Sequence, residues 1–170
     1  MLNWAVTVNN GPVALRYPRG GDVVYSGSAW EDDFGISGGV CNHRSGKDVT
    51  IVTYGTLVHN AISAAENLQQ KGIEATVLRM LTIEPLPVDT ICNMLSENHR
   101  VFVMEETCGS GVRQELAWNI LKRIPDCQIS GIDLGRQYIT HGKVDALYRH
   151  YGLDGESVAE LIMKEYFHES

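Results

Sequence analysis

One short stretch of the chain combines residue types that bind anions. It reads Arg16-Tyr17-Pro18-Arg19-Gly20-Gly21, in a sequence of 170 residues. Planar guanidinium groups bind phosphate or carboxylate through two parallel hydrogen bonds, and glycines allow a ligand to approach the backbone closely. The alternative is a pair of surface arginines in salt bridges across a domain interface, which spacing alone favours.

A pair of carboxylates and a loop histidine are weaker candidates. Glu105-Glu106 follows a strand-like run and has the residue type needed for acid–base catalysis. Because adjacent residues of a strand point to opposite faces, we expect one of the two to be a structural hydrogen-bond acceptor and not half of a catalytic dyad. His141 precedes Gly142 in a loop and carries a side chain that titrates near neutral pH. A histidine satisfied by neighbouring backbone is the alternative for it.

Two glycine-containing turns precede expected helices. Gly55-Thr56 and Gly109-Ser110-Gly111 lie where strand ends meet helix N-termini, which attract anions. Neither turn matches a dinucleotide-binding or Walker motif. Tight turns and helix caps, with Thr56 as an N-cap, are therefore the favoured interpretation. Cys108 also lies near a helix N-terminus, but no base follows it closely in sequence.

The elements that must position these residues begin with one strand–helix–strand unit, Asp48 to Met80. Val49 to Val52 is a β-branched run typical of a strand buried on both faces. Leucine and alanine then recur at helical spacing, and Gly72 lies where a left-handed C-cap belongs. Ile73 to Leu78 is a second β-rich run. Parallel strands joined by a helix cross over right-handedly, so the unit predicts a sheet covered by a helix.

The rest of the chain continues this alternation. Pro87 suits the first turn of a helix through Leu95. We expect further strands at 100–104 and 128–134, and further helices after Gly111, at 143–150 and at 154–167 with Asp154 as a cap. This order predicts an α/β fold, a three-layer α/β/α sandwich around a mostly parallel sheet of about five strands. The turn at 45–47 also predicts an antiparallel edge strand at 40–43, paired with the strand at 49–53.

The N-terminal part carries much less pattern. Residues 2–8 suit a short helix and residues 13–16 a short strand, which is too little for a domain. We therefore expect residues 1–20 to be the end of a domain that lies upstream. Seven of the 17 glycines fall within 20–47, a composition typical of a linker.

Composition excludes several classes of protein. The net charge of −7 argues against a general nucleic-acid binder, and no run approaches the roughly 20 apolar residues of a membrane span. The four cysteines form no CxxC pair, and His43 and His59 have no partner at metal-ligand spacing. We therefore expect reduced thiols, no bound metal and a cytoplasmic protein without nucleic-acid or membrane partners.

Several segments, taken in order, resemble one family. They are GPVALRYPRG (11–20), residues 48–80, EPLP (84–87), VMEE (103–106), and YITHG through YGLDGESVAELI (138–162). The chain resembles the C-terminal part of the 1-deoxy-D-xylulose-5-phosphate synthases, which belong to the transketolase superfamily. RYPRG and YGLD are the more specific parts, whereas the middle also resembles transketolases and the beta subunits of 2-oxo-acid dehydrogenases.

The resemblance implies a transferase of isoprenoid biosynthesis that condenses pyruvate with glyceraldehyde 3-phosphate, using thiamine diphosphate and Mg²⁺. It implies that residues 1–20 end the pyrimidine-binding domain, 21–47 form a linker and 48–170 form the C-terminal domain. It further implies that Arg19 contacts the phosphate of the substrate, with Arg16 and Tyr17 as additional candidates, and that the enzyme is a homodimer.

Two turns depart from the family pattern. Thr107 to Val112 stands where a glycine–phenylalanine-rich turn is expected, and Gly135-Arg136 where a proline–aspartate pair is expected. The GDG motif that binds the diphosphate and the glutamate segment that activates the cofactor ring are both missing. We therefore expect the chain alone to bind no cofactor and to be inactive, serving as a structural and dimerising part beside the missing N-terminal domains. The alternatives are another enzyme of the superfamily, and a free-standing module that binds a small effector or a partner protein.

Overall fold

The computed structural model describes residues 6–7, 11–15, 39–95, 97–109 and 111–167. The chain divides into two units, Met1–Ser37 and Gly38–Ser170. In the first unit, a short strand was expected at residues 13–16. The described residues 13–15 form no strand, so this prediction is wrong for them. Arg16, Tyr17 and Arg19 lie outside the described residues.

The second unit is built around a five-stranded sheet with the order β1-β3-β2-β4-β5. β1 runs antiparallel to β3, and the other neighbouring pairs are parallel. This confirms the predicted α/β sandwich with one antiparallel edge strand. The elements are β1 (Val40–Arg44), β2 (Val49–Tyr54), η2 (Gly55–Leu57), α2 (Val58–Gln70), β3 (Ala75–Met80), α3 (Val88–Met94), β4 (Arg100–Met104), α4 (Arg113–Leu121), β5 (Gln128–Ile132), α5 (Val144–His150) and α6 (Gly155–Tyr166).

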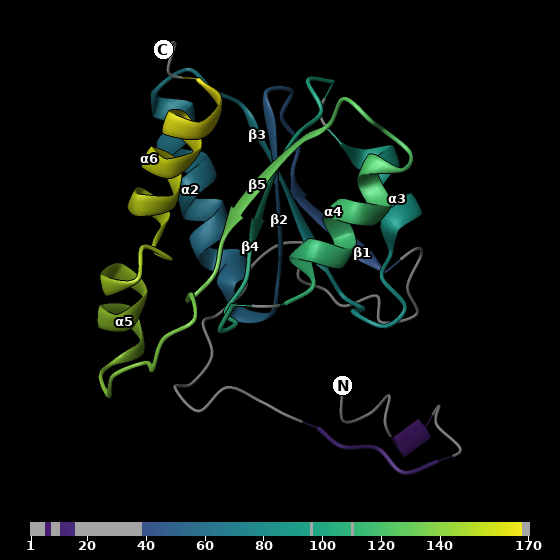
Figure 1. Ribbon diagram of the computed structural model, residues 1–170, viewed down its shortest axis with the longest axis vertical. Helices are drawn as coiled ribbons and strands as arrows, with labels where there is room; N and C mark the ends of the chain where they lie inside the picture. The colour runs from purple at the N-terminus through teal and green to yellow at the C-terminus, as the bar shows by residue number, and fades with distance from the viewer. Residues whose placement is uncertain (1–5, 8–10, 16–38, 96, 110, 168–170) are drawn as a thin grey trace. The chain divides into compact units, whose positions relative to one another are not determined.

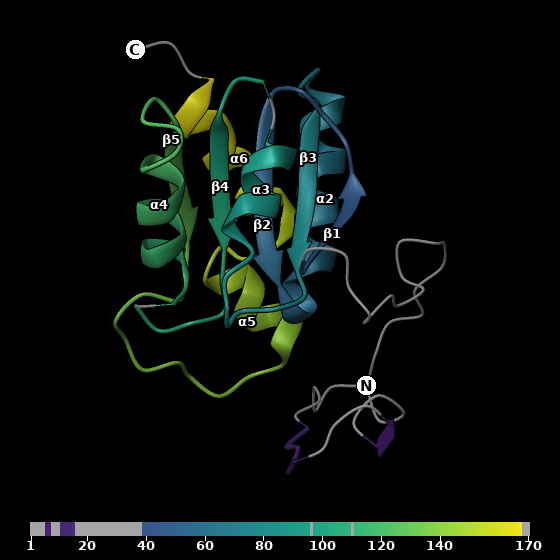
Figure 2. The ribbon, with the colours of Figure 1, turned by 90° about the vertical axis from the view of Figure 1, so that its right-hand side faces the viewer.

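Helices cover both faces of the sheet. α2 and α6 lie on one face, and α3 and α4 lie on the other (Figures 1 and 2). On the α2 side, alanines at 61, 64 and 65 are fully buried, and a Cβ on Gly155 would overlap Ser63, so the two helices approach closely. On the α3–α4 side, Leu116 and Ile120 pack with Val52, Leu78 and other apolar side chains of the sheet.

β2 is the central strand because its residues are apolar or small on both faces. Val49 to Thr53 are all buried, and the hydroxyl of Thr53 donates to the backbone oxygen of Met104 at 3.0 Å. Parallel pairing then brings the ends of β2, β4 and β5 to one edge of the sheet, called the carboxyl edge below. α5 lies at this edge (Figure 1).

Two expectations about local structure are wrong. β1 pairs with β3, not with the strand at 49–53, because the central strand β2 already has neighbours on both sides. The turn before β2 passes over the start of β3, where the backbone of Gly46 exchanges hydrogen bonds with the hydroxyl of Thr76 at 2.9 and 2.7 Å. Thr56 does not cap α2, since the chain enters that helix through η2 without a side-chain cap.

Other expected caps and turns agree with the structure. Gly72 has a φ of +81°, as a left-handed C-cap requires. Asp154 caps α6, because its carboxylate accepts hydrogen bonds from the backbone N–H groups of Glu156 and Ser157, both at 3.2 Å. None of the helices in the described part of the chain has the length and apolar character needed to cross a bilayer.

Candidate functional site

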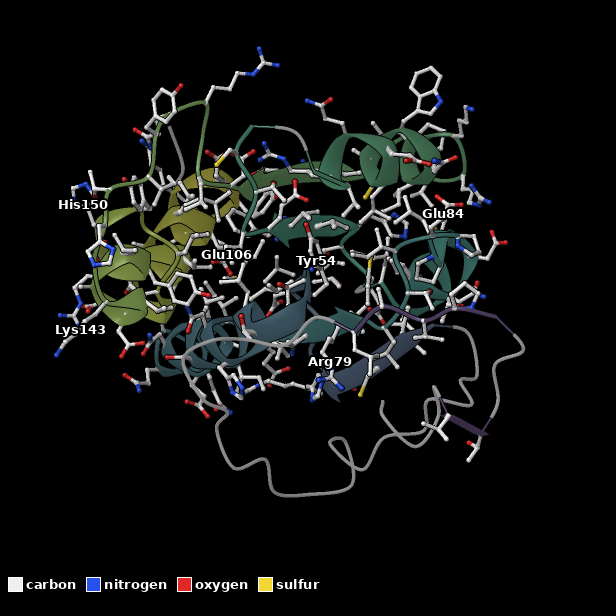
Figure 3. The ribbon with its side chains drawn as sticks, turned by 90° about the horizontal axis from the view of Figure 1, so that it is seen from below. Tyr54, Arg79, Glu84, Glu106, Lys143 and His150 are labelled. Carbon is white, nitrogen blue, oxygen red and sulfur yellow. The ribbon has the colours of Figure 1, made fainter. Side chains whose placement is uncertain are left out.

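Polar side chains gather at the carboxyl edge, between the ends of β2 and β4. The chain leaves β2 toward β3 on one side of the sheet, while β4 and β5 lie on the other side. Open α/β sheets bind ligands where the strand order reverses in this way. Viewed from below, Tyr54 and Glu106 lie near the middle of this edge (Figure 3).

Glu105 fills this position with its own carboxylate. The side chain is 1% exposed and accepts hydrogen bonds from the backbone N–H groups of Val112 at 2.9 Å and Arg113 at 3.4 Å. The hydroxyl of Tyr54 donates to the same carboxylate at 3.3 Å. Burial, together with the charge of Glu105, raises the pKa of Tyr54 to about 12, so this phenol stays protonated and remains a donor.

The neighbouring Glu106 is exposed and points to α5. The hydroxyl of Tyr148 donates to the Glu106 carboxylate at 2.8 Å and lies 3.4 Å from the hydroxyl of Thr56. Burial raises the pKa of Tyr148 to about 12; the hydrogen bond with Thr56 acts against this rise, and Glu106 adds to it. The two adjacent carboxylates therefore have separate tyrosine partners and do not form a dyad.

An ion pair joins α4 to the end of β5. Nη2 of Arg113 lies 2.8 Å from Oδ2 of Asp133, and the other oxygen of Asp133 accepts from the backbone N–H of Gly135 at 2.7 Å. Most of the Asp133 side chain is buried. The Nη2 group of Arg113 is thus paired with a structural carboxylate.

The arrangement does not fit thiamine diphosphate. The N-terminus of α4, which is the natural place for a diphosphate, is already occupied by the carboxylate of Glu105, whose negative charge would repel one. Among the described residues, no group of three or more histidine, cysteine, aspartate or glutamate side chains is placed to hold a metal ion. The described edge is a set of structural hydrogen bonds.

Sequence reasoning identified part of this edge. Glu105 is the structural acceptor expected of one member of the pair, while His141 and Cys108 are exposed. Tyr54, Tyr148, Arg113 and Asp133 were missed. Of these four, only Tyr54 could have been identified from the sequence, because it lies at the end of an expected strand. Tyr148 comes close to Glu106 only in the tertiary structure.

A second polar group lies on β1, β3 and α2. Burial, with the charges of Arg79 and His59, lowers the pKa of His43 to about 4. His43 is therefore neutral at pH 7. No motif in the sequence links His43, Arg79 and His59, because they lie on three different elements.

The five-stranded, mostly parallel sheet with β2 at its centre and helices on both faces defines a three-layer α/β domain. A family model described as "Transketolase, C-terminal domain" matches residues 38–158. The chain belongs to this family.

Curated relatives narrow the resemblance further. The chain is 33% identical over 168 residues to the 1-deoxy-D-xylulose-5-phosphate synthase of Clostridium kluyveri, and 33% identical over 172 residues to that of Desulforudis audaxviator. The matches cover 96% and 97% of this chain but 26% of each relative. The chain thus spans about a quarter of the length of these enzymes.

Solved structures share the fold. A chain described as "Split gene transketolase, inactive beta4 tetramer" is 25% identical, with a TM-score of 0.60 over 77% of this chain and 43% of that one. A transketolase of Pichia stipitis is 19% identical, with a TM-score of 0.59 over 76% of this chain and 18% of that one.

Proposed function

We propose that this chain is the C-terminal part of a synthase that condenses pyruvate with glyceraldehyde 3-phosphate to 1-deoxy-D-xylulose 5-phosphate. The cofactor, thiamine diphosphate with Mg²⁺, is held by domains that match the other three-quarters of the relatives. This chain supplies a structural and dimerising domain of a cytoplasmic transferase. Arg19 supplies a contact to the phosphate of the aldehyde substrate, with Arg16 and Tyr17 beside it.

One observation carries this proposal. The relatives named as this synthase match 96 to 98% of the chain, including the RYPRG stretch, which precedes the family model's residues 38–158. The buried carboxylate of Glu105 supports the structural role, since it fills the edge at which related folds bind ligands.

The first test separates the chain from the rest of the enzyme. Purified chain, mixed with thiamine diphosphate, Mg²⁺, pyruvate and glyceraldehyde 3-phosphate, is expected to release no carbon dioxide and to form no product. Turnover by the chain alone would refute the structural role.

The second test restores the missing part. A chimera carries this chain in place of the last quarter of the Clostridium kluyveri synthase, and we expect it to form 1-deoxy-D-xylulose 5-phosphate. In the chimera, Arg19→Ala should raise the KM for glyceraldehyde 3-phosphate by roughly 10- to 100-fold, the cost of one charge-assisted hydrogen-bond pair. The KM for pyruvate should stay unchanged. Lys164→Ala, on the exposed side of α6, is the control, and equal effects of the two substitutions would contradict the role of Arg19.

A second candidate is a chain of a transketolase-like enzyme with another substrate. The solved split-gene transketolase, at 25% identity, favours this alternative. The chimera distinguishes the two, because a transketolase-type chain would support transfer from a ketose phosphate donor and not decarboxylation of pyruvate.

A further inference from the structure

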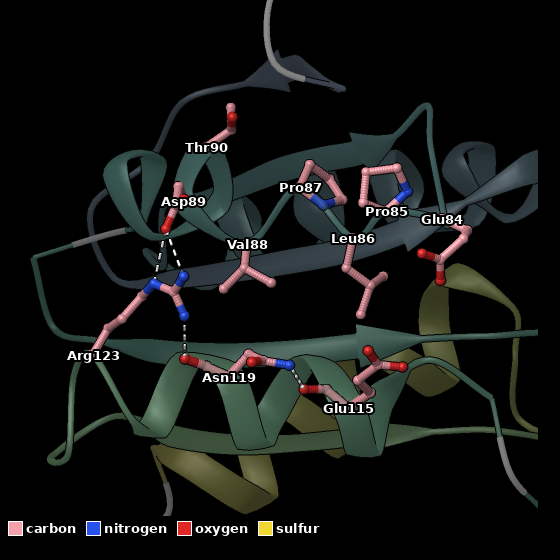
Figure 4. A pocket seen from close by; sticks show the side chains of 10 residues that line it. All are labelled: Glu84, Pro85, Leu86, Pro87, Val88, Asp89, Thr90, Glu115, Asn119 and Arg123. Atoms are coloured by element: carbon pink, nitrogen blue, oxygen red, sulfur yellow. Dashed lines mark hydrogen bonds and ion pairs between the residues drawn. The ribbon is translucent and has the colours of Figure 1, made fainter.

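A groove lies between the loop at 84–87 and α4, on the side of the sheet that α3 and α4 cover (Figures 2 and 4). It has a volume of about 400 Å³, which is within the usual range of ligand sites. Pro85, Leu86 and Pro87 supply apolar surface on one wall. Val88 in this wall and Leu116 of α4 are buried in the same core, so the two walls are held at a fixed separation. The groove is therefore preformed, and little ordering of the chain accompanies the binding of a ligand.

Two carboxylates in this groove have no cation beside them. Glu84 extends from the loop and Glu115 from α4, so that they lie at the same end of the groove on opposite walls (Figure 4). Both residues are exposed. Within the part of the chain that the structure describes, neither of them forms an ion pair. This end of the groove therefore carries negative charge that a cationic ligand would neutralise.

The polar groups at the other end are already paired with one another. Nη2 of Arg123 lies 2.7 Å from Oδ1 of Asp89, and its Nε donates to the same oxygen at 2.8 Å. Nη1 of Arg123 donates to the backbone oxygen of Asn119 at 3.0 Å, and the amide of Asn119 donates to the backbone oxygen of Glu115 at 2.8 Å. Dashed lines in Figure 4 mark these interactions. Because Arg123 is held by Asp89, it does not compensate the carboxylates of Glu84 and Glu115.

This combination of charge and apolar surface fits an arginine side chain. A guanidinium group donates hydrogen bonds to two carboxylates at once, and its methylene stem covers apolar surface such as that of Leu86. Among the described residues, no three or more histidine, cysteine, aspartate or glutamate side chains are placed to hold a metal ion, so a cation with a carbon stem fits better than a bare one. Ile83, which is 44% exposed and precedes Glu84, adds apolar surface for a residue beside the arginine. We propose that the groove docks an arginine flanked by aliphatic residues in an extended segment of a partner protein.

The test is a titration of the full chain with a short peptide, acetyl-Gly-Val-Arg-Val-Gly-amide. Calorimetry measures the affinity, and NMR shifts of the backbone amides locate the site. The control peptide has citrulline in place of arginine, which keeps the shape of the side chain and removes its charge. We expect the arginine peptide to bind roughly tenfold more tightly than the control, and more weakly as salt is added. The largest shifts should fall within residues 83–90 and 113–123.

Substitutions of the two carboxylates test the site itself. Glu84→Gln and Glu115→Gln should each weaken binding of the arginine peptide by roughly three- to tenfold, because each removes one charge from an exposed pair. Glu160→Gln is the matched control, since it makes the same change on α6, at the opposite face of the sheet (Figure 2). This variant should bind the peptide as the wild type does. Circular dichroism establishes that each variant is folded.

Each outcome decides whether the groove is this docking site. Tighter binding of the arginine peptide, with loss in both glutamine variants, supports it. Absence of binding at millimolar concentrations, equal binding of the two peptides, or binding that neither variant weakens would overturn it. Arginine amide or spermidine that binds as tightly as the peptide would assign the groove to a small cationic molecule, and self-association that both variants abolish would assign it to a second copy. Either of these results would overturn the protein partner.

Discussion

Gly111 is the residue that allows Glu105 to stay buried at the start of α4. A Cβ at this position would overlap the carboxylate of Glu105 and approach the hydroxyl of Thr107 to 2.8 Å. We expect Gly111→Ala to lower the free energy of unfolding by about 1–3 kcal/mol, the usual cost of overpacking a filled site. Urea unfolding measures this loss. Gly11→Ala, where a Cβ meets nothing within 4 Å, is the control and should change stability little.

His43 gives the domain a sensitivity to acid. Its pKa of about 4 in the folded chain lies below the ordinary value of 6.5, so the unfolded chain takes up a proton first as the pH falls. The contribution of neutral His43 to the free energy of unfolding is therefore fully present above about pH 6.5 and is lost as the pH falls toward 4. We expect His43→Gln to lose less stability than the wild type between about pH 7 and pH 5, measured by urea unfolding. His141→Gln, at an exposed position, should keep the full loss; equal pH dependence of wild type and His43→Gln would contradict this account.

For single residues, the sequence predicted whether a side chain has a structural or a catalytic role better than it predicted which side chain it contacts. The alternation of side chains along a strand was enough to predict that Glu105 and Glu106 would not work together, because it depends on local geometry. The tyrosine that each carboxylate contacts comes from β2 or from α5, which only the tertiary fold brings close. The side chains of Arg16, Tyr17 and Arg19 fall outside the described residues, so their roles remain predictions.

Among the elements, α5 is held by few contacts. It has no buried residue, and the Tyr148 hydroxyl is its hydrogen-bonded link to Glu106 and to Thr56. We expect Tyr148→Phe to increase hydrogen exchange in residues 144–150 several-fold while changing global stability by roughly 1 kcal/mol or less. The contrasting variant is Tyr166→Phe, which removes the 2.6 Å hydrogen bond to the backbone oxygen of Val101 in β4. Loss of that bond should increase hydrogen exchange across the sheet. If both variants increased hydrogen exchange in α5 alone, Tyr148 would not be the specific anchor of α5.

The positions of helices and strands were easier to predict from the sequence than the pairing of the strands. Strands and helices with strong periodicity were predicted within a few residues, since a buried β-branched run and a helical stripe are local signals. The predicted partner of β1 was wrong because hairpin logic pairs neighbours in sequence, whereas β2 lies in the centre of the sheet, between β3 and β4, and cannot pair with a third strand. The turn at 45–47 carried the right residue types for a reversal, but Gly46 is fixed by Thr76 of β3 instead.

For the whole molecule, the N-terminal boundary of the second unit lies earlier in the chain than the expected end of the linker. The linker was expected to extend to residue 47, yet β1 lies within that range, and the second compact unit begins at Gly38. Val40 is 8% exposed and packs in the core with Leu78 and Met80, so β1 contributes apolar burial as well as ladder hydrogen bonds.

Two truncated chains separate these boundaries. We expect residues 38–170 to fold with nearly the free energy of unfolding of the full chain, because every strand of the sheet is retained. Residues 48–170 lack β1, which removes the burial of Val40, worth about 1.5–3 kcal/mol, and leaves the backbone groups of β3 as an unprotected edge. Such an edge pairs readily with other chains, so this variant should be less stable by about 2 kcal/mol or more and should aggregate in light scattering. Equal stability and solubility of the two truncated chains would place the boundary at residue 48 and make β1 an accessory strand.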